Sequence, residues 1–546
     1  MEQAAVSRAP AGKWMIAATV MLATYVAVID ITIVNVAMPQ MRGTFGVTLD
    51  AITWVAVAYS IAEIVMVTMA SWFTQLLGRK RFYIYCLTLF TVASVFSGLS
   101  RSLEMMVLTR VLQGLGGGAL IPMAMAIMLE IFPEEEHGTA MAVFMMGVVL
   151  APAMGPVLGG WLTDQYGWPW IFYINLPIGA VSIVMVLAFL TESEHLQRGL
   201  ARIDGVGIVL LVVGLTSLQL FLERGEREDW FSSMFIVVAA VVALVALVTL
   251  VVWELQVEEP IVNLRVFKNV PFVGGASMGM VFGLTTFGSI FILPLFLQQV
   301  RGYTVMDSGL IQLPRMLIMV VVAPIAGRLY GRVDSRLLAG IGTAVMMVGY
   351  FDMARFTLEV GFMRMLPGLL MTGAGMAFMF SVMSAATMRT IPPALLTAAS
   401  GLFTLSRRIG GNIGYAFVAN QITHRGTFHR ARLVDYLTPY DGGTTQVLEG
   451  LTGRLAGRGL PPGVAEESAL KLLEGTVDRQ ATMMAYNDVF WLMGMLFVLG
   501  LPFLLLLGRG ARPSAPAPAQ PARHPPDEGG TQQPETHDAE KLVRET

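Results

Sequence analysis

Long apolar runs recur from one end of the chain to the other, and they restrict it to a membrane-spanning fold. Each run holds about twenty residues, enough for an α-helix to cross a hydrocarbon core about 30 Å thick. Runs such as 235–253 are apolar on every face and lack the strict alternation of a membrane β-barrel strand. The sequence therefore predicts an all-α integral membrane protein with fourteen transmembrane helices. The predicted spans are 14–37, 52–74, 82–100, 104–128, 138–161, 168–190, 204–222, 232–253, 272–298, 309–330, 337–356, 362–386, 398–421 and 488–508.

The composition agrees with a membrane protein. Of 546 residues, 55% are hydrophobic and 14% are charged, whereas soluble proteins carry about a quarter charged residues. The 36 Lys and Arg residues do not exceed the 38 Asp and Glu residues, so no basic surface for nucleic acid is expected. We therefore expect the helices to be surrounded by the lipid bilayer.

The distribution of Lys and Arg among the short loops predicts the orientation. An even number of spans places both termini on one side, and the cytoplasmic side collects the positive charges. With the termini in the cytoplasm, the inner loops hold Arg79, Lys80, Arg81, Arg198, Arg202, Arg265, Lys268, Arg332, Arg336 and Arg389. The outer short loops hold fewer, chiefly Arg42, Arg101, Arg224, Arg227, Arg301 and Arg364. We therefore expect a bacterial inner-membrane protein with both termini in the cytoplasm.

A repeated basic loop divides the chain into halves. Gly78, Arg79 and Lys80 follow the second span, and a similar segment at 327–336 follows the tenth. Spans 1–6 and 9–14 then form two six-helix bundles with two helices inserted between them, a construction common in secondary transporters. The predicted parts are a cytoplasmic head (1–13), the first bundle (14–190), inserted helices with linkers (191–271), the second bundle (272–508) and a disordered cytoplasmic tail (509–546).

A long outer loop at 422–487 belongs to the second bundle. Its segments 444–458 and 464–484 have helix-like apolar spacing. Two interpretations remain open: a solvated lid over the transporter, or a periplasmic docking surface for a partner protein.

Charged side chains inside the spans point to pairing or function, because inserting each one at mid-membrane costs roughly 2.5 to 3.5 kcal/mol of free energy. Asp30 lies about 24 Å along the first span, and Arg110 lies about 9 Å into the fourth from its outer end, so their depths are similar. Asp30 is either an ion-pair partner of Arg110 or a titratable carboxylate that faces a central cavity. Gln113 shares a face with Arg110 and is its expected polar neighbour.

Glu63 lies about 17 Å into the second span, near mid-depth, among apolar neighbours. No cation is adjacent in sequence. This carboxyl is a candidate proton carrier or a partner for a cationic ligand, and the alternative is a hydrogen bond to a neighbouring helix. Arg315 and Asp352 fall near outer span ends and Arg407 and Arg408 nearer an inner end, where long side chains can reach the interface.

Several chemistries are not expected. All six histidines fall in loops or tails, so the spans offer no haem or metal site. The chain has no GxxxxGK[ST] loop for ATP and no nucleophile constellation, so we expect no cofactor and no enzyme activity. An ion gradient is the remaining source of energy.

Small residues and prolines cluster in the fifth span. They let neighbouring helices approach closely and make the helix bendable. The members of this cluster are Gly147, Ala151, Pro152, Gly155, Pro156, Gly159 and Gly160. In the fourth span, Arg110, Gln113 and Gly114 begin a second such surface that continues to Gly118.

These motifs resemble those of the major facilitator superfamily, in particular its fourteen-helix drug:proton antiporters of the EmrB type. The segment from Leu108 to Gly114 resembles the fourth-helix motif, and the cluster from Gly147 to Gly160 resembles the antiporter motif. The segments 30–39, 170–179, 222–233 and 260–267 also fit this branch, and the resemblance covers about residues 14–508. The loop after the second span departs from the superfamily pattern with Ser71 and Gln75 in place of Gly and Asp, while Gly78, Arg79 and Lys80 are retained.

The resemblance implies proton-coupled export of hydrophobic or cationic drugs and toxic compounds by alternating access. It also implies a membrane-fusion adaptor with an outer-membrane channel as possible partners. We predict Asp30 and Glu63 as the protonatable groups, with Arg110 and Gln113 as the network that tunes Asp30. The prediction for Glu63 rests on its depth in the span and not on the resemblance. An exporter of a defined metabolite or siderophore would share every motif. A proton-coupled uptake symporter would lack the antiporter motif at 147–160.

Overall fold

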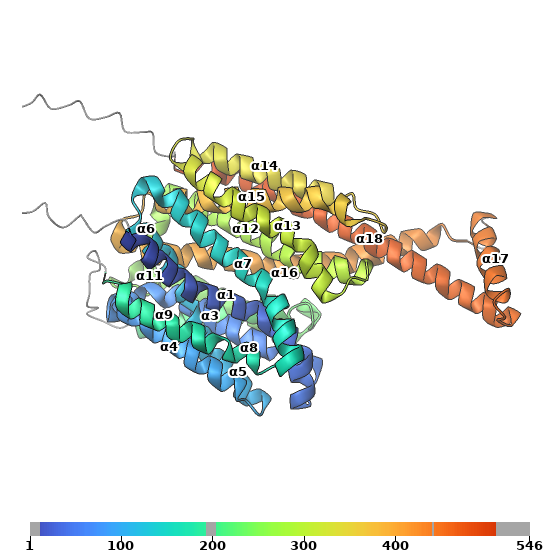
Figure 1. The fold of residues 1–546 in the computed structure, drawn as a ribbon, viewed down its shortest axis with the longest axis horizontal. Helices are drawn as coiled ribbons and strands as arrows, with labels where there is room; N and C mark the ends of the chain where they lie inside the picture. Colours follow the sequence, from blue (N-terminus) through green and yellow to red (C-terminus); the bar gives the residue numbers. More distant parts are fainter. Residues whose placement is uncertain (1–10, 193–203, 439, 441, 509–546) are drawn as a thin grey trace, which may run out of the picture. The chain divides into compact units, whose positions relative to one another are not determined.

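The computed structural model describes residues 11–192, 204–438, 440 and 442–508, and these residues form helices and their connections without a β-strand. They belong to one compact unit, Met1–Ala511 (Figure 1). The predicted cytoplasmic tail and most of the predicted head lie outside the described residues, and so does part of the linker at 193–203.

The described helices follow the order of the predicted spans. The first half comprises α1 (Ala11–Phe45), α2 (Leu49–Ile52), α3 (Trp54–Leu77), α4 (Arg79–Gly98), α5 (Leu103–Gly118), α6 (Leu120–Ile131), α7 (His137–Tyr166), α8 (Trp170–Tyr173) and α9 (Asn175–Phe189). The two inserted helices are α10 (Gly205–Arg224) and α11 (Met234–Gln256). The second half comprises α12 (Val270–Leu295), α13 (Val305–Tyr330), α14 (Ser335–Met353), α15 (Phe362–Met388), α16 (Leu396–Asp435), α17 (Gly442–Ala456) and α18 (Pro462–Leu504).

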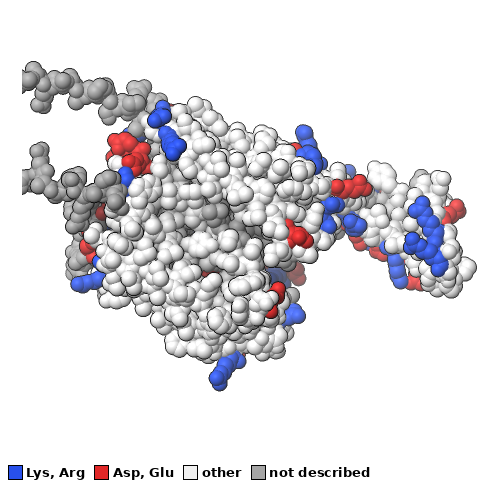
Figure 2. Space-filling model, viewed as in Figure 1, with Lys and Arg blue, Asp and Glu red and all other residues white. Residues whose placement is uncertain are grey.

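Within the described residues, 11 helical segments are long and apolar enough to cross a membrane. The predicted spans at 138–161, 337–356 and 398–421 correspond to α7, α14 and α16, which are helical but are not among the 11. In α16 the adjacent Arg407 and Arg408 interrupt the apolar sequence. Charged side chains gather toward the ends of the helical body, and the surface between them is almost free of charge (Figure 2). The protein is therefore a multi-pass membrane protein.

The segment predicted as a long outer loop is a helical arm. Helix α16 continues to Asp435, and α18 begins at Pro462, so both membrane helices extend beyond the body and α17 lies at the far end (Figure 1). Arg430 on α16 donates to Asp478 and Glu474 on α18, at 2.7 and 2.8 Å. His429 lies 2.8 Å from the Asp488 carboxylate. These pairs hold the two helices side by side, so the arm is a continuation of the second bundle.

Glycines let α16 pack closely against α12. A Cβ atom added to Gly283 would meet the carbonyl oxygen of Arg407, one added to Gly410 would meet that of Met280, and one added to Gly414 would meet that of Leu284. On α16 these backbone contacts fall at Arg407 itself and at the two glycines that follow Arg408. They fix the depth and direction of α16 and thereby the position of its two arginines.

Candidate functional site

Asp30 on α1 lies at the centre of a buried polar network within the first half. Its carboxylate accepts hydrogen bonds from Arg110 Nη1 (2.5 Å), Gln113 Nε2 (2.9 Å) and Asn175 Nδ2 (3.0 Å). All four side chains are almost inaccessible to solvent. Asn175 Nδ2 also lies 3.0 Å from the Ser94 hydroxyl, so α1, α4, α5 and α9 all contribute. The ion pair between Asp30 and Arg110 that their depths suggested is present.

The guanidinium of Arg110 has further partners besides Asp30. Its Nε donates to the Val55 carbonyl at 3.1 Å, and Nη1 also donates to Gln113 at 2.8 Å. Its guanidinium lies 4.2 Å from the centre of the Tyr59 ring, a cation–π contact. A buried charge is tolerated when it is paired and hydrogen-bonded, and Arg110 has such partners on several sides.

Glu63 on α3 forms an ion pair with Arg408 on α16. The Glu63 side chain is 2% exposed and that of Arg408 is 15% exposed. Since α3 belongs to the first half and α16 to the second, this pair joins the two halves. The cation that the sequence around Glu63 did not supply comes from 345 residues away.

Glycines of the fourth-span motif place Glu63. A Cβ atom on Gly114 would lie 2.5 Å from the Tyr59 carbonyl oxygen, and one on Gly118 would lie 2.5 Å from the Glu63 carbonyl oxygen. Helices α3 and α5 therefore touch through their backbones at these points. The same motif carries Arg110 and Gln113, so it positions both acidic sites.

The expectation that the arginines reach the membrane interface is wrong for three of them. Arg315 is 4% exposed; its guanidinium donates to the Ser289 hydroxyl at 2.9 Å and contacts Met376 Sδ at the same distance. Arg407 is 8% exposed and lies near the rings of Phe287 and Phe380. Arg408 pairs with Glu63. Each of these arginines lies about ten residues or more, roughly 15 Å of helix rise, from the nearer end of its helix, so its side chain lies inside the packed bundle. Asp352 forms a partly exposed pair with Arg364.

The antiporter motif on α7 packs against α1. Cβ atoms on Gly147, Gly155 and Gly159 would collide with side chains of Met21, Thr32 and Ile33. Ala151 is fully buried. A Cβ on Gly160 would meet nothing within 4 Å. Helix α7 continues through Pro152 and Pro156 without interruption. The motif is therefore a close-contact seam with α1, which carries Asp30.

The loop after the second span connects α3 to α4 and anchors the start of α4. Gly78 has a φ of 86°, a conformation that favours glycine. Buried Arg79 forms an ion pair with Glu130 at the end of α6, and Lys80 Nζ donates to the Leu187 carbonyl of α9 at 2.8 Å. Although Gln75 supplies no carboxylate, Glu130 supplies one from the fourth span, so Arg79 remains paired.

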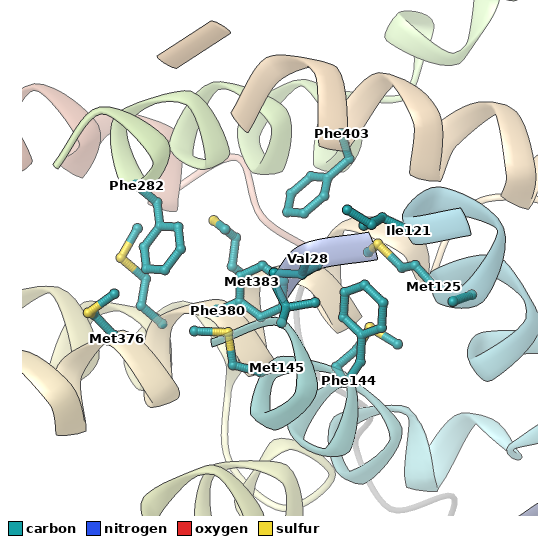
Figure 3. Close-up of a cluster of buried hydrophobic side chains, with 14 of the residues drawn as sticks. Val28, Ile121, Met125, Phe144, Met145, Phe282, Met376, Phe380, Met383 and Phe403 are labelled. Atoms are coloured by element: carbon teal, nitrogen blue, oxygen red, sulfur yellow. The ribbon is translucent and has the colours of Figure 1, made fainter. Parts of the chain in front are cut away.

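A cluster of methionine and phenylalanine side chains lies where the two halves meet. Its labelled members point toward one another from both halves (Figure 3). Phe144 on α7 stacks against Phe380 on α15 with ring centres 6.2 Å apart, and Phe282 and Phe403 also contact Phe380. The labelled members are all buried: Val28, Ile121, Met125, Phe144, Met145, Phe282, Met376, Phe380, Met383 and Phe403. Methionine side chains adapt to varied apolar shapes.

The sequence model of the Major Facilitator Superfamily matches residues 20–415. The chain belongs to this superfamily. It is similar to the multidrug export protein EmrB of Escherichia coli K12, with 34% identity over 489 residues that cover 89% of this chain and 92% of the relative. The fatty acid resistance protein FarB of Neisseria gonorrhoeae is 29% identical over 89% of this chain and 94% of its own length. The predicted membership in the superfamily is confirmed, and the relatives are of the predicted EmrB type.

Solved structures show the same superfamily fold. The proton:xylose symporter XylE has a TM-score of 0.57 and 12% identity, covering 91% of this chain and 95% of its own. The human organic anion transporter MFSD10 has a TM-score of 0.57 and 13% identity, covering 90% of this chain and all of its own.

Sequence reasoning missed several residues of the site. Arg408 was assigned to a span end, although its distance from the start of α16 at Leu396 places it about 18 Å along the helix. Asn175 lies in the segment 170–179, which fits the EmrB branch, but its hydrogen bond to Asp30 was not predicted. Tyr59 lies one turn from Glu63, and its ring packs against the Arg110 guanidinium.

Proposed function

We propose that the protein is a proton-coupled antiporter that exports hydrophobic or cationic drugs across the bacterial inner membrane by alternating access. The proposal includes fourteen membrane-spanning helices, in two six-helix bundles with α10 and α11 inserted, and both termini in the cytoplasm. Relatives named for multidrug export, fatty acid resistance and colistin resistance differ widely in the compounds named, which supports a broad substrate range.

The ion pair between Glu63 and Arg408 carries this proposal. Its carboxylate is buried, and the pair lies between the halves that alternating access would move apart. Protonation of Glu63 removes one charge of the pair and so removes the attraction that holds α3 to α16 at that depth. One carboxylate cannot hold a proton and pair with a cation at the same time, so proton binding and release are linked to the arrangement of the halves.

Asp30 is the second protonatable group in the proposal. Three donors hold its carboxylate, so taking up a proton requires Arg110 to give up its ion pair. Because the glycine seam on α7 packs along the helix that carries Asp30, a change at Asp30 is transmitted to the fifth span. The buried Met and Phe cluster (Figure 3) supplies an adaptable apolar surface between the halves for varied substrates.

We further propose that the arm of α16, α17 and α18 docks a periplasmic membrane-fusion adaptor that leads to an outer-membrane channel. Every described side chain of α17 is at least partly exposed, and α17 lies beyond the helical body (Figure 1). The paired helices that carry it would present it at a fixed distance from the membrane. A simple lid would instead fold back over the body.

Dye efflux tests the proposed function. The full chain, expressed in a host that lacks its own pumps, is loaded with a fluorescent lipophilic cation, and efflux is followed before and after the proton gradient is collapsed. We expect gradient-dependent efflux from the wild type and little from Glu63→Gln at equal membrane abundance. Efflux that persists after collapse, or a normally active Glu63→Gln, contradicts the proposal. Uptake in place of efflux supports the symporter.

A further inference from the structure

Arg315 on α13 is a buried cation that neither of the two acidic sites uses. It is 4% exposed, and its guanidinium donates to the Ser289 hydroxyl of α12 and contacts the Met376 sulfur of α15, both at 2.9 Å. Tyr350 of α14 is a further neighbour, and its hydroxyl donates to the Thr285 carbonyl at 3.2 Å. All of these side chains are neutral, and a thioether sulfur is only a weak acceptor.

Among the described residues, no carboxylate pairs with Arg315. Helices α12 and α15, which supply its contacts, contain no Asp or Glu. Asp307 at the start of α13 and Asp164 near the end of α7 are exposed, and Asp352 of α14 pairs with Arg364. Since a buried charge is normally compensated by an opposite charge, the Arg315 guanidinium is available to an anion from outside the chain.

Arg315 lies at one end of the methionine and phenylalanine cluster (Figure 3). Met376, which its guanidinium contacts, is a labelled member of that cluster. On α15, Phe380 follows Met376 by four residues and so shares its face. On α12, Ser289 follows Phe282 by seven residues, about 10 Å of helix rise. The apolar surface of the cluster therefore ends at a buried positive charge.

A second polar group on α12 lies between Ser289 and the cluster. Thr286 follows Phe282 by four residues and precedes Ser289 by three, so the three side chains share one helix face. The Thr286 hydroxyl is buried, and no described residue hydrogen-bonds to it. Buried polar groups in proteins are almost always hydrogen-bonded. This face thus offers an unused donor close to the unpaired guanidinium.

We propose that Arg315 binds the carboxylate of an amphiphilic organic anion whose hydrocarbon part lies on the methionine and phenylalanine cluster. A guanidinium presents a fork of N–H donors that matches a carboxylate, and such charged hydrogen bonds are among the strongest in proteins. This inference rests on the cluster as the proposed substrate surface and adds a head-group site to it. It extends the ligands from hydrophobic and cationic compounds to lipophilic carboxylates.

The Met376 side chain controls access to the guanidinium. Its sulfur lies against Arg315 in the structure, and an unbranched thioether changes rotamer easily. The ring of Phe144 from the first half stacks on that of Phe380 from the second, so separation of the halves uncovers the cluster. An anion that enters between the halves then reaches Arg315 when Met376 turns aside.

Binding of dodecanoate to the purified full chain in lipid nanodiscs tests the site without a proton gradient. Radiolabelled dodecanoate is compared with dodecanol, which has the same chain and no charge, and empty nanodiscs give the background. We expect the wild type to bind dodecanoate about tenfold or more tighter than dodecanol, and Arg315→Met to lose this difference. Arg328→Gln replaces an exposed arginine of the same helix and should bind like the wild type.

The melting temperature provides the second readout. A ligand that binds only the folded protein raises its Tm, so dodecanoate should raise the Tm of the wild type and of Arg328→Gln but not that of Arg315→Met. Arg315→Lys keeps the charge without the fork of donors and should retain part of the preference for dodecanoate. If Arg315→Met does not fold, Arg315→Lys and the comparison of the two ligands on the wild type make the same test.

Equal affinity of the wild type for dodecanoate and dodecanol overturns the inference, and so does an unchanged preference for dodecanoate in Arg315→Met. The proposed function fails in a different way. A wild type without gradient-dependent dye efflux that still prefers dodecanoate through Arg315 contradicts the proposed function and supports the site. Gradient-dependent efflux without any head-group preference overturns the inference alone.

Discussion

Buried Glu63 on α3 forms an ion pair with partly exposed Arg408 on α16 between the two halves of the transporter, although 345 residues separate them in the chain. The pair has two roles: each charge compensates the other inside the protein, and protonation of Glu63 is proposed to couple transport to the proton gradient. Substitution of one or both residues distinguishes the two roles.

Arg408→Gln leaves Glu63 buried without its cation. Breaking a buried pair from one side costs about 3–5 kcal/mol, so we expect a clear loss of thermal stability in detergent. The double variant Glu63→Gln/Arg408→Gln removes both charges and should recover most of that stability while efflux stays uncoupled from the gradient. A double variant as unstable as the single one would show that charge compensation is not the reason.

Asp30→Asn leaves Arg110 without its carboxylate. Because Arg110 is 1% exposed, we expect a loss of about 3–5 kcal/mol, seen as reduced yield and a lower Tm. Asp30→Asn/Arg110→Met, which removes both charges, should restore folded protein without restoring transport. If Asp30→Asn folds and pumps normally, Asp30 has neither role.

Gly118→Ala places a methyl group against the backbone of Glu63. The added Cβ would lie 2.5 Å from a carbonyl oxygen, so α3 and α5 must separate, at a cost of about 1–3 kcal/mol. We expect a lower Tm together with reduced efflux. Gly160→Ala is the matched control, since its Cβ would meet nothing within 4 Å and its Tm should not fall. Equal Tm values for the two variants would argue against the close contact.

Removal of the tip of the arm tests the proposed docking surface. Replacing residues 438–460 with a short Gly-Ser linker deletes α17 and keeps the paired parts of α16 and α18. We expect normal gradient-driven transport in proteoliposomes and lost drug resistance in cells that supply an adaptor. The ion pairs of Arg430 remain in this variant and hold the helices together. Impaired transport in proteoliposomes would favour the lid.

The sequence predicted the helical membrane fold, because an apolar run near the thickness of a bilayer has few alternatives to a helix. It also offered the pair of Asp30 and Arg110 as one of two interpretations of Asp30, since both residues stand out in apolar spans and their depths agree. The superfamily motifs identified the glycines that bring α3, α5, α1 and α7 together. Each of these conclusions depends on local composition or on distance along one helix.

Only the tertiary structure decided which distant charges meet. Arg408 is an ordinary charged residue by sequence, and nothing near Glu63 in the chain indicates it. It meets Glu63 because the glycine contacts between α12 and α16 fix this arginine at the depth of Glu63. The apolar spacing at 444–458 and 464–484 indicated helices in the outer segment, and α17 and the start of α18 lie there. The sequence did not indicate that α16 and α18 run on from the membrane as two long helices paired with each other. Which side chains share a depth and a face across different helices is a property of packing, which the linear order of residues does not specify.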